Sequence, residues 1–138
     1  MQIQPYLFFD GRCREAFEFY RSVLGGELWM MTCGESPDAE RMPPQLRDTI
    51  IHARLTVGEA VLMASDSPPQ WYEKPQGYSV SISVADSAEA ERVFAALSEG
   101  GAVSMPMAET FFAARFGMCV DRYGTRWMVL GGQKNAAA

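Results

Sequence analysis

The sequence predicts an α+β fold built from two tandem βαβββ modules, each with one main helix. One observation is the order of the predicted elements, which runs strand, helix, strand, strand, strand and then repeats. A second is the glycine pair that follows each predicted helix, Gly25-Gly26 and Gly100-Gly101. A third is composition, because 48% apolar and 21% charged types among 138 residues are enough for one core. We therefore expect a single domain over residues 1–131.

Module one is expected at about residues 1–66. Its predicted strands are Ile3–Phe9, Leu28–Cys33, Thr49–Val57 and Ala60–Ser65, and its predicted helix is Arg12–Leu24. The helix is predicted from apolar residues that recur every three or four positions, namely Cys13, Ala16, Phe17, Tyr20, Val23 and Leu24. Residues 34–48 are polar and contain three prolines, so they predict a long loop that covers a binding site.

Module two is expected at about residues 77–131. Its predicted strands are Gly77–Val84, Val103–Met107, Phe111–Val120 and Arg126–Leu130, and its predicted helix is Asp86–Glu99. The helix is predicted from the apolar residues Ala90, Val93, Phe94 and Leu97, which recur at helical spacing. Asp86 followed three positions later by Glu89 predicts a capping box at its start. Residues 132–138 have no pattern and are expected to form a loose tail.

Charge and hydropathy exclude several classes of protein. A net charge of −5 argues against nucleic acid as a partner, because binding phosphates normally requires a basic excess. No apolar run reaches the length of a membrane span, and the first residues do not resemble a secretory signal. Three widely spaced cysteines are typical of reduced thiols. We therefore expect a cytoplasmic protein.

The alternation of side chains along the predicted strands separates two sheet faces. In Thr49–Val57 the apolar residues would face the helix, which leaves His52 and Arg54 on the opposite face. In Gly77–Val84 the same logic places Ser79 and Ser81 opposite the helix. Such mixed polar and apolar faces suit a ligand groove better than a dry core.

In the predicted strand Phe111–Val120, one parity is wholly apolar and is expected under the helix. Phe111 and Arg115 fall on the other parity and would join the groove. A mid-strand arginine requires a carboxylate, a ligand anion or water. Candidate internal partners are Asp66, Glu109 and Asp121.

Several segments resemble a known family. Residues 16–26 (AFEFYRSVLGG) resemble the first-helix signature of the vicinal oxygen chelate superfamily, which includes glyoxalase I, bleomycin-resistance proteins and extradiol dioxygenases. Five further segments resemble the PhnB-like branch of this superfamily: PYLFFDG (5–11), PPQLRD (43–48), HARL (52–55), MASDSP (63–68) and FFAARFGMCVDRYG (111–124). The resemblance covers about residues 2–130 and implies an open, barrel-like mixed sheet around a cavity, and a homodimer.

Members of this branch often carry the names glyoxalase or 3-demethylubiquinone-9 3-methyltransferase, but a shared fold does not define a reaction. A methyltransferase would need a cofactor site in a doubly wound sheet. This chain is too short for such a sheet, and its elements are in the wrong order. We therefore do not expect methyl transfer.

The resemblance also provides a test for metal. Metal-dependent relatives use four His, Glu or Gln side chains, and the matching positions here are Pro5, Met63, Ser79 and Met128. None offers the imidazole or carboxylate that a divalent ion takes. We therefore expect no metal and no cofactor. Met63, Met128 and Cys119 are the right types for a soft ion such as Cu(I), but strand methionines more often fill core space.

Together these observations predict a metal-free, homodimeric protein that binds an unknown small molecule in the cavity. The predicted ligand-binding residues are His52, Arg54, Met63, Ser79, Ser81, Phe111, Arg115 and Met128. One alternative is a lyase- or isomerase-like enzyme that uses His52 or Arg115 on a small carbonyl compound. Two others are an antibiotic-sequestering resistance protein and a plain interaction module.

Overall fold

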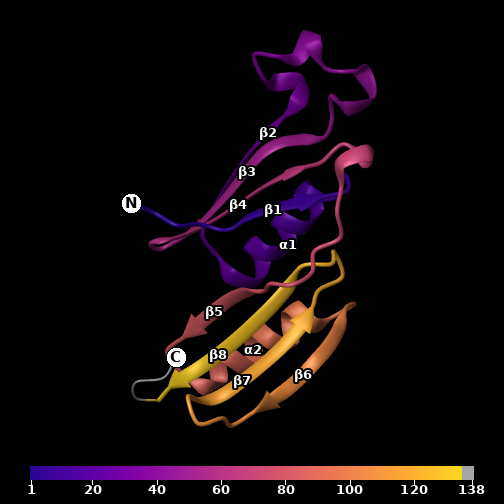
Figure 1. Cartoon of the computed structure of the whole chain (residues 1–138). Helices are drawn as coiled ribbons and strands as arrows, with labels where there is room; N and C mark the ends of the chain where they lie inside the picture. Colours follow the sequence, from indigo (N-terminus) through magenta and orange to yellow (C-terminus); the bar gives the residue numbers. More distant parts are fainter. Residues whose placement is uncertain (135–138) are drawn as a thin grey trace. The chain divides into compact units, whose positions relative to one another are not determined.

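The computed structural model describes residues 1–134, and the chain divides into two compact units, Met1–Glu73 and a second that begins at Lys74. Each unit contains one βαβββ module with one main helix (Figure 1). The predicted fold class, with two tandem modules and open mixed sheets, is therefore confirmed. Within residues 1–134, neither helix is long and apolar enough to cross a lipid bilayer.

Unit 1 is one four-stranded mixed sheet with a helix packed on one face (Figure 1). Its elements are β1 (Tyr6–Phe9), α1 (Cys13–Leu24), β2 (Glu27–Thr32), β3 (Ile50–Val57) and β4 (Ala60–Asp66). The strand order is β1-β4-β3-β2, with β1 parallel to β4 and the other neighbours antiparallel. β1 and β2 are the edge strands, so this sheet is open.

Unit 2 repeats this topology. Its elements are β5 (Val80–Val84), α2 (Ser87–Ser98), β6 (Ala102–Ala108), β7 (Ala113–Val120) and β8 (Arg126–Gln133). The order β5-β8-β7-β6 matches that of unit 1 strand for strand, again with one parallel pair, β5 and β8. The repeat predicted from the element order is thus a repeat of sheet topology.

The predicted helix stripes form the core of each unit. In α1 the side chains of Cys13, Phe17 and Tyr20 are fully buried, and the Phe17 ring meets the Phe9 ring edge to face with centroids 6.1 Å apart. Burial of one such aromatic side chain contributes about 1.5–3 kcal/mol. In α2 the buried residues are Ala90, Val93, Phe94 and Leu97. Helical periodicity therefore located both core faces correctly.

Only half of the capping box predicted for α2 is present. The Asp86 carboxylate accepts a hydrogen bond from the Glu89 backbone N–H at 2.8 Å, as expected for an N-cap. The Glu89 side chain instead binds the guanidinium of Arg92, with its closest oxygen 2.6 Å from Nη2. A nearby arginine offers the carboxylate a charged donor, which is a stronger partner than a backbone amide.

The second glycine of each pair lets the chain pass close to the neighbouring strand. At Gly26 the φ angle is +92°, and a Cβ would run into the carbonyl oxygen of Thr56 on β3. At Gly101 a Cβ would run into the carbonyl oxygen of Val120 on β7. The glycine pairs therefore end the helices and also admit the close approach of the next strand.

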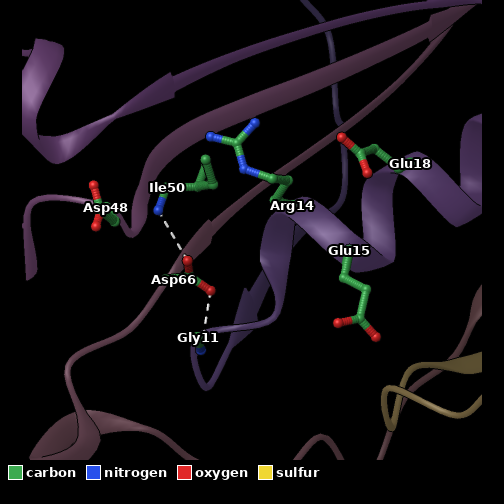
Figure 2. Close-up of a pocket in the computed structure, with 7 residues that line it drawn as sticks. All are labelled: Gly11, Arg14, Glu15, Glu18, Asp48, Ile50 and Asp66. Atoms are coloured by element: carbon green, nitrogen blue, oxygen red, sulfur yellow. Dashed lines mark hydrogen bonds between the residues drawn. The ribbon is translucent and has the colours of Figure 1, made fainter.

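Asp66, at the end of β4, joins three segments of unit 1 (Figure 2). Its Oδ1 accepts hydrogen bonds from the backbone N–H of Gly11 at 3.0 Å and of Cys13 at 2.9 Å. Its Oδ2 accepts from the N–H of Ile50 at 2.9 Å. Arg12, which precedes α1, provides no side-chain cap. The cap of α1 therefore comes from a distant strand, and its negative charge suits a helix N-terminus.

Several predicted boundaries are wrong by a few residues. β1 begins at Tyr6 rather than Ile3, and β5 begins at Val80 rather than Gly77. The predicted loop 34–48 is not plain loop, because it is part of a segment with three short 3₁₀ helices, Cys33–Glu35, Ala39–Arg41 and Pro44–Leu46. Local turns such as these satisfy backbone groups without a strand partner, and alternation in the sequence does not detect them.

The predicted loose tail also begins too early. β8 continues to Gln133, and the backbone N–H of Lys134 donates to the carbonyl of Phe112 at 2.7 Å. The Lys134 ammonium lies 2.6 Å from the Glu109 carboxylate. The predicted strand ended at Leu130, but pairing with β7 continues past it to Gln133. The rest of the predicted tail, residues 135–138, lies outside the described residues.

Candidate functional site

The sheet face of unit 1 that α1 does not cover carries three of the predicted ligand residues, and we call it the open face of unit 1. The strand register places Trp29 of β2 beside Arg54 of β3, Arg54 beside Met63 of β4, and Met63 beside Tyr6 of β1. His52 lies two positions from Arg54 on the same face. The intervening residues, which are buried on the helix side, include Leu7, Ala53, Leu55 and Ala64.

An aromatic cluster holds His52 in place. The Tyr6 hydroxyl and His52 Nδ1 are 3.0 Å apart, and the two rings are stacked with centroids 5.6 Å apart. The ring centroids of Trp29 and His52 are 5.8 Å apart, and those of Phe8 and Tyr6 are 5.2 Å apart. If the hydroxyl donates to Nδ1, the ring proton is on Nε2, which is then a donor for a ligand.

Arg54 supplies positive charge on this face. Its side chain is exposed, and within residues 1–134 it forms no ion pair. Trp29 beside it is 50% exposed, so a flat apolar surface lies next to a guanidinium. Guanidinium groups bind carboxylates and phosphates well, and aromatic rings stack on flat molecules. The combination suits a flat anion.

Sequence reasoning missed Tyr6 and Phe8 as members of this face. The signal was present in the four residues of β1, where Leu7 and Phe9 are buried while Tyr6 and Phe8 are not. Strict alternation was hard to see because all four residues are apolar or aromatic. Trp29 was not among the predicted ligand residues, because the strand register with Arg54 was needed to place it.

In unit 2 the corresponding face, which α2 does not cover, brings together two further predicted residues. Ser81 of β5 is the register partner of Met128 of β8, and Met128 is the partner of Met118 on β7. Ser79 lies just before β5 and is half-buried. Phe111 precedes β7, is 80% exposed and contacts the ring of Phe112. We call this surface the open face of unit 2.

The predicted place of Arg115 is wrong, because it lies on the helix-covered face of β7. Its Nε lies 2.6 Å from the Glu91 carboxylate of α2, and its Nη2 donates to the Met107 carbonyl at 3.1 Å. Glu91 was not among the predicted partners. The face assignment was inverted because the side under α2 requires small residues: a Cβ at Gly117 would lie 2.8 Å from the Phe94 ring. Large apolar residues therefore occupy the open face instead.

Unit 1 also contains a cavity of about 350 Å³ beside the N-terminus of α1, which no sequence pattern indicated (Figure 2). Its lining residues are Gly11, Arg14, Glu15, Glu18, Asp48, Ile50 and Asp66. Asp66 already accepts three backbone hydrogen bonds there. Most of the charged side chains that line the cavity are carboxylates, and Asp66 among them has the structural role of capping α1. We therefore interpret the cavity as part of this helix cap and not as a catalytic site.

The cysteines are not poised as nucleophiles. Cys13, Cys33 and Cys119 are all buried. Burial raises the pKa of the Cys13 thiol, with the Asp66 charge adding to the effect, and burial likewise raises the pKa of the Cys119 thiol. A buried thiol with a raised pKa is protonated at neutral pH and reacts slowly.

The residues at the four metal positions of the superfamily do not fit a divalent ion. The Pro5 carbonyl accepts the Met63 backbone N–H at 3.2 Å, and the other positions offer thioethers or a neutral hydroxyl. Among residues 1–134, no group of three or more His, Cys, Asp or Glu side chains is placed to hold an ion. The soft set considered above also fails, because Cys119 and Met128 lie on opposite faces of unit 2.

The chain is similar to several known proteins. It is 33% identical over 138 residues to Protein YjdN of Escherichia coli (strain K12), covering 94% of each chain. Among solved structures, protein PA1353 from Pseudomonas aeruginosa is 51% identical, with a TM-score of 0.89 and coverage of 97% of this chain and 99% of that one. A PhnB protein from Bacillus cereus is 26% identical, with a TM-score of 0.77 and coverage of 96% and 100%.

The family described as 3-demethylubiquinone-9 3-methyltransferase matches residues 1–130. More distant structures share the fold alone, such as a member of the glyoxalase/bleomycin resistance protein/dioxygenase superfamily from Sphaerobacter thermophilus, at 18% identity and a TM-score of 0.57. Family, relatives and topology agree with the resemblance in the sequence. The chain belongs to the family described as 3-demethylubiquinone-9 3-methyltransferase.

Proposed function

We propose that this protein binds a small, flat, anionic molecule on the open face of unit 1. The observation that carries the proposal is the register row Trp29–Arg54–Met63–Tyr6, with the Tyr6–His52 hydrogen bond beside it. Arg54 would receive the anionic group, and the rings of Trp29 and Tyr6 would contact the flat body. Met63 between them supplies adaptable apolar contact.

A carboxylate on an aromatic ring is the simplest ligand with this chemistry. The exposed Arg54 can bind a carboxylate with two parallel hydrogen bonds, and His52 Nε2 can donate a third. A methyl-transfer reaction is not part of the proposal, despite the family name. The four-stranded sheets of both units lack the doubly wound order that a nucleotide-type cofactor site uses.

Two further features belong to the proposal. We expect a homodimer, to be measured by sedimentation equilibrium. We also expect residues 34–48 to cover the bound molecule. Support for a stable cover comes from its ends, since Gly34 N–H donates to the Arg47 carbonyl and Cys33 N–H to the Thr49 carbonyl, each at 2.9 Å. Ends held in this way limit the conformations of the segment between them.

The binding test uses three probes that separate charge from shape. Benzoate has the charge and the ring, benzamide lacks the charge, and cyclohexanecarboxylate lacks the flat ring. We expect benzoate alone to shift the NMR signal of the Trp29 indole N–H in a saturable titration. Arg54→Gln should abolish the preference for benzoate over benzamide. Arg21→Gln removes an equal charge from an exposed residue of α1, which covers the opposite face of the sheet, and should leave the titration unchanged.

The proposal fails if all three probes behave alike, or if Arg54→Gln and Arg21→Gln give the same titration. Unchanged signals for Trp29 with changes elsewhere would also contradict this location. Both arginines are exposed, so neither substitution removes a buried contact. Differences between the variants therefore report on binding and not on folding.

An acid–base enzyme acting on a small carbonyl compound is the second candidate. The Tyr6–His52 pair favours it, because a histidine with a bonded, oriented ring can act as a general acid or base. Arg115 no longer supports it, because Glu91 holds that guanidinium. Turnover of a panel of carbonyl compounds should fall on His52→Ala, and unchanged rates would remove His52 from the chemistry. Antibiotic sequestration and a purely structural role stay predictions.

A further inference from the structure

Three methionines form a continuous row across the open face of unit 2. The register places Met105 of β6 beside Met118 of β7, and Met118 beside Met128 of β8. The three strands are neighbours in the sheet (Figure 1). Side chains of directly opposed residues share one face, with Cβ atoms about 4.5–5.5 Å apart. Three thioethers from three consecutive strands are thus neighbours, and Met118 lies in the middle.

The surroundings of this row are apolar and open to solvent at one end. Met118 and Met128 are half-buried. Together with Phe112 they pack against the buried cluster of Ala113, Phe116 and Leu130. Met105 is 46% exposed, although a large apolar side chain usually avoids water. The row therefore has an accessible end and a sheltered end.

The chemistry of three adjacent thioethers is specific. A thioether is a soft, neutral donor that selects soft monovalent ions such as Cu(I) and is a poor ligand for Mg²⁺ or Ca²⁺. A methionine side chain has three rotatable bonds, so two outer sulfurs can lean toward a central one. A monovalent ion brings little charge into an apolar site, which keeps its desolvation cost lower than that of a divalent ion.

We propose that Met105, Met118 and Met128 together bind one Cu(I) ion on the open face of unit 2. The site is separate from the ligand face proposed for unit 1. Of the superfamily's four divalent-metal positions it shares only Met128. It also differs from the soft set suggested by sequence, because Cys119 lies under α2 and cannot join Met128. Ser81, the register partner of Met128, places a hydroxyl beside the row.

The competing explanation is that the methionines only fill space. Leucine has nearly the volume of methionine and no sulfur, so Met→Leu preserves packing and removes the ligand. A packing role predicts that Met118→Leu leaves the protein unchanged in every respect. A metal site predicts that only ion binding changes. Met31→Leu, on β2 of unit 1, is the matched control.

The experiment labels the methionine methyl carbons with ¹³C and titrates the intact protein with Ag(I), a redox-inert probe for Cu(I), without oxygen. One equivalent should shift the methyl signals of Met105, Met118 and Met128 together, as assigned by the three leucine variants. Competition with a Cu(I) chelator should then show an affinity lower by about tenfold or more in Met118→Leu and unchanged in Met31→Leu.

The proposal is overturned if these three signals stay in place at one equivalent of Ag(I), or if they move only when the spectrum shows unfolding. Loss of Cu(I) binding on blocking the cysteines, with the Met118→Leu affinity unchanged, would assign the ion to thiols and reject the row. Amide spectra of each variant verify that the fold is kept. Failure here would leave the benzoate titration on unit 1 untouched.

Discussion

Asp66 is the position where one substitution should cost unit 1 most clearly. Its two carboxylate oxygens accept three backbone N–H groups, at distances of 2.9 to 3.0 Å, from Gly11, Cys13 and Ile50. These amides belong to the β1–α1 turn, the first turn of α1 and the start of β3. Asp66→Ala removes both acceptor oxygens, and with them all three hydrogen bonds, and leaves a small gap beside the helix.

The magnitude follows from the groups that lose a partner. Loss of a helix N-cap costs about 0.5–2 kcal/mol. Ile50 is buried, so its stranded amide adds about 1–3 kcal/mol. We therefore expect Asp66→Ala to lower the free energy of unfolding by about 3 kcal/mol. Asp66→Asn keeps one carbonyl oxygen and should lose about half as much.

Urea unfolding of the full chain, followed by tryptophan fluorescence, measures this loss. With a slope of about 1–3 kcal/mol per molar, the midpoint should fall by about 1–3 M. Asp48→Ala is the matched control, since Asp48 lines the same cavity and is exposed (Figure 2). The control should stay within about 0.5 kcal/mol of the original protein. Equal midpoints for Asp66→Ala and Asp48→Ala would refute the cap.

Three other predictions concern the repeat, a buried carboxylate and pH. Gly101→Ala should lower the urea midpoint far more than Ala102→Gly, because its Cβ meets the Val120 carbonyl; a matching loss in both would contradict this. Asp121 is 3% exposed, and its carboxylate accepts hydrogen bonds from Tyr123, Thr125 and Trp127. Asp121→Asn replaces one acceptor oxygen with an NH2 group that faces these donors, so it should lower the free energy of unfolding by about 1–3 kcal/mol. An unchanged urea midpoint would argue against this role. Hydrogen bonds from the backbone and side chain of Thr32 lower the pKa of Glu35 below 4.5, so its contribution is present above pH 4.5 and is lost as the pH falls through the folded-state pKa. Glu35→Gln should remove that part of the acid dependence of the midpoint, and an identical pH profile would contradict the assignment.

The topology was largely predictable because local patterns repeat. Helical periodicity identified Phe17 and Phe94 as core residues, and both are buried. The glycine pairs correctly marked the end of the helix in both modules. Their close approach to the carbonyl oxygens of Thr56 and Val120 was visible only in the tertiary structure. Alternation also placed His52 and Arg54 on one face correctly, because the opposite parity of β3 includes the buried Ala53 and Leu55.

The second face of unit 2 was not predictable in the same way. Alternation divides β7 into two sets but does not say which set meets the helix. The more apolar set was expected under α2, yet the helix approaches so closely that Gly117 is required there. Arg115 consequently bonds Glu91, while Met118 and Phe116 lie on the open face.

By itself the sequence determined the element order, the two-module repeat and the family, because these depend on spacing along the chain. Only the tertiary structure decided which distant side chains become neighbours. Strand register set Trp29 against Arg54 and Met105 against Met118, and a single-residue slip would reverse every such pairing. The tertiary structure also made Asp66 the cap of α1, a helix that begins some fifty positions earlier in the chain. No local sequence pattern encodes this hydrogen bond.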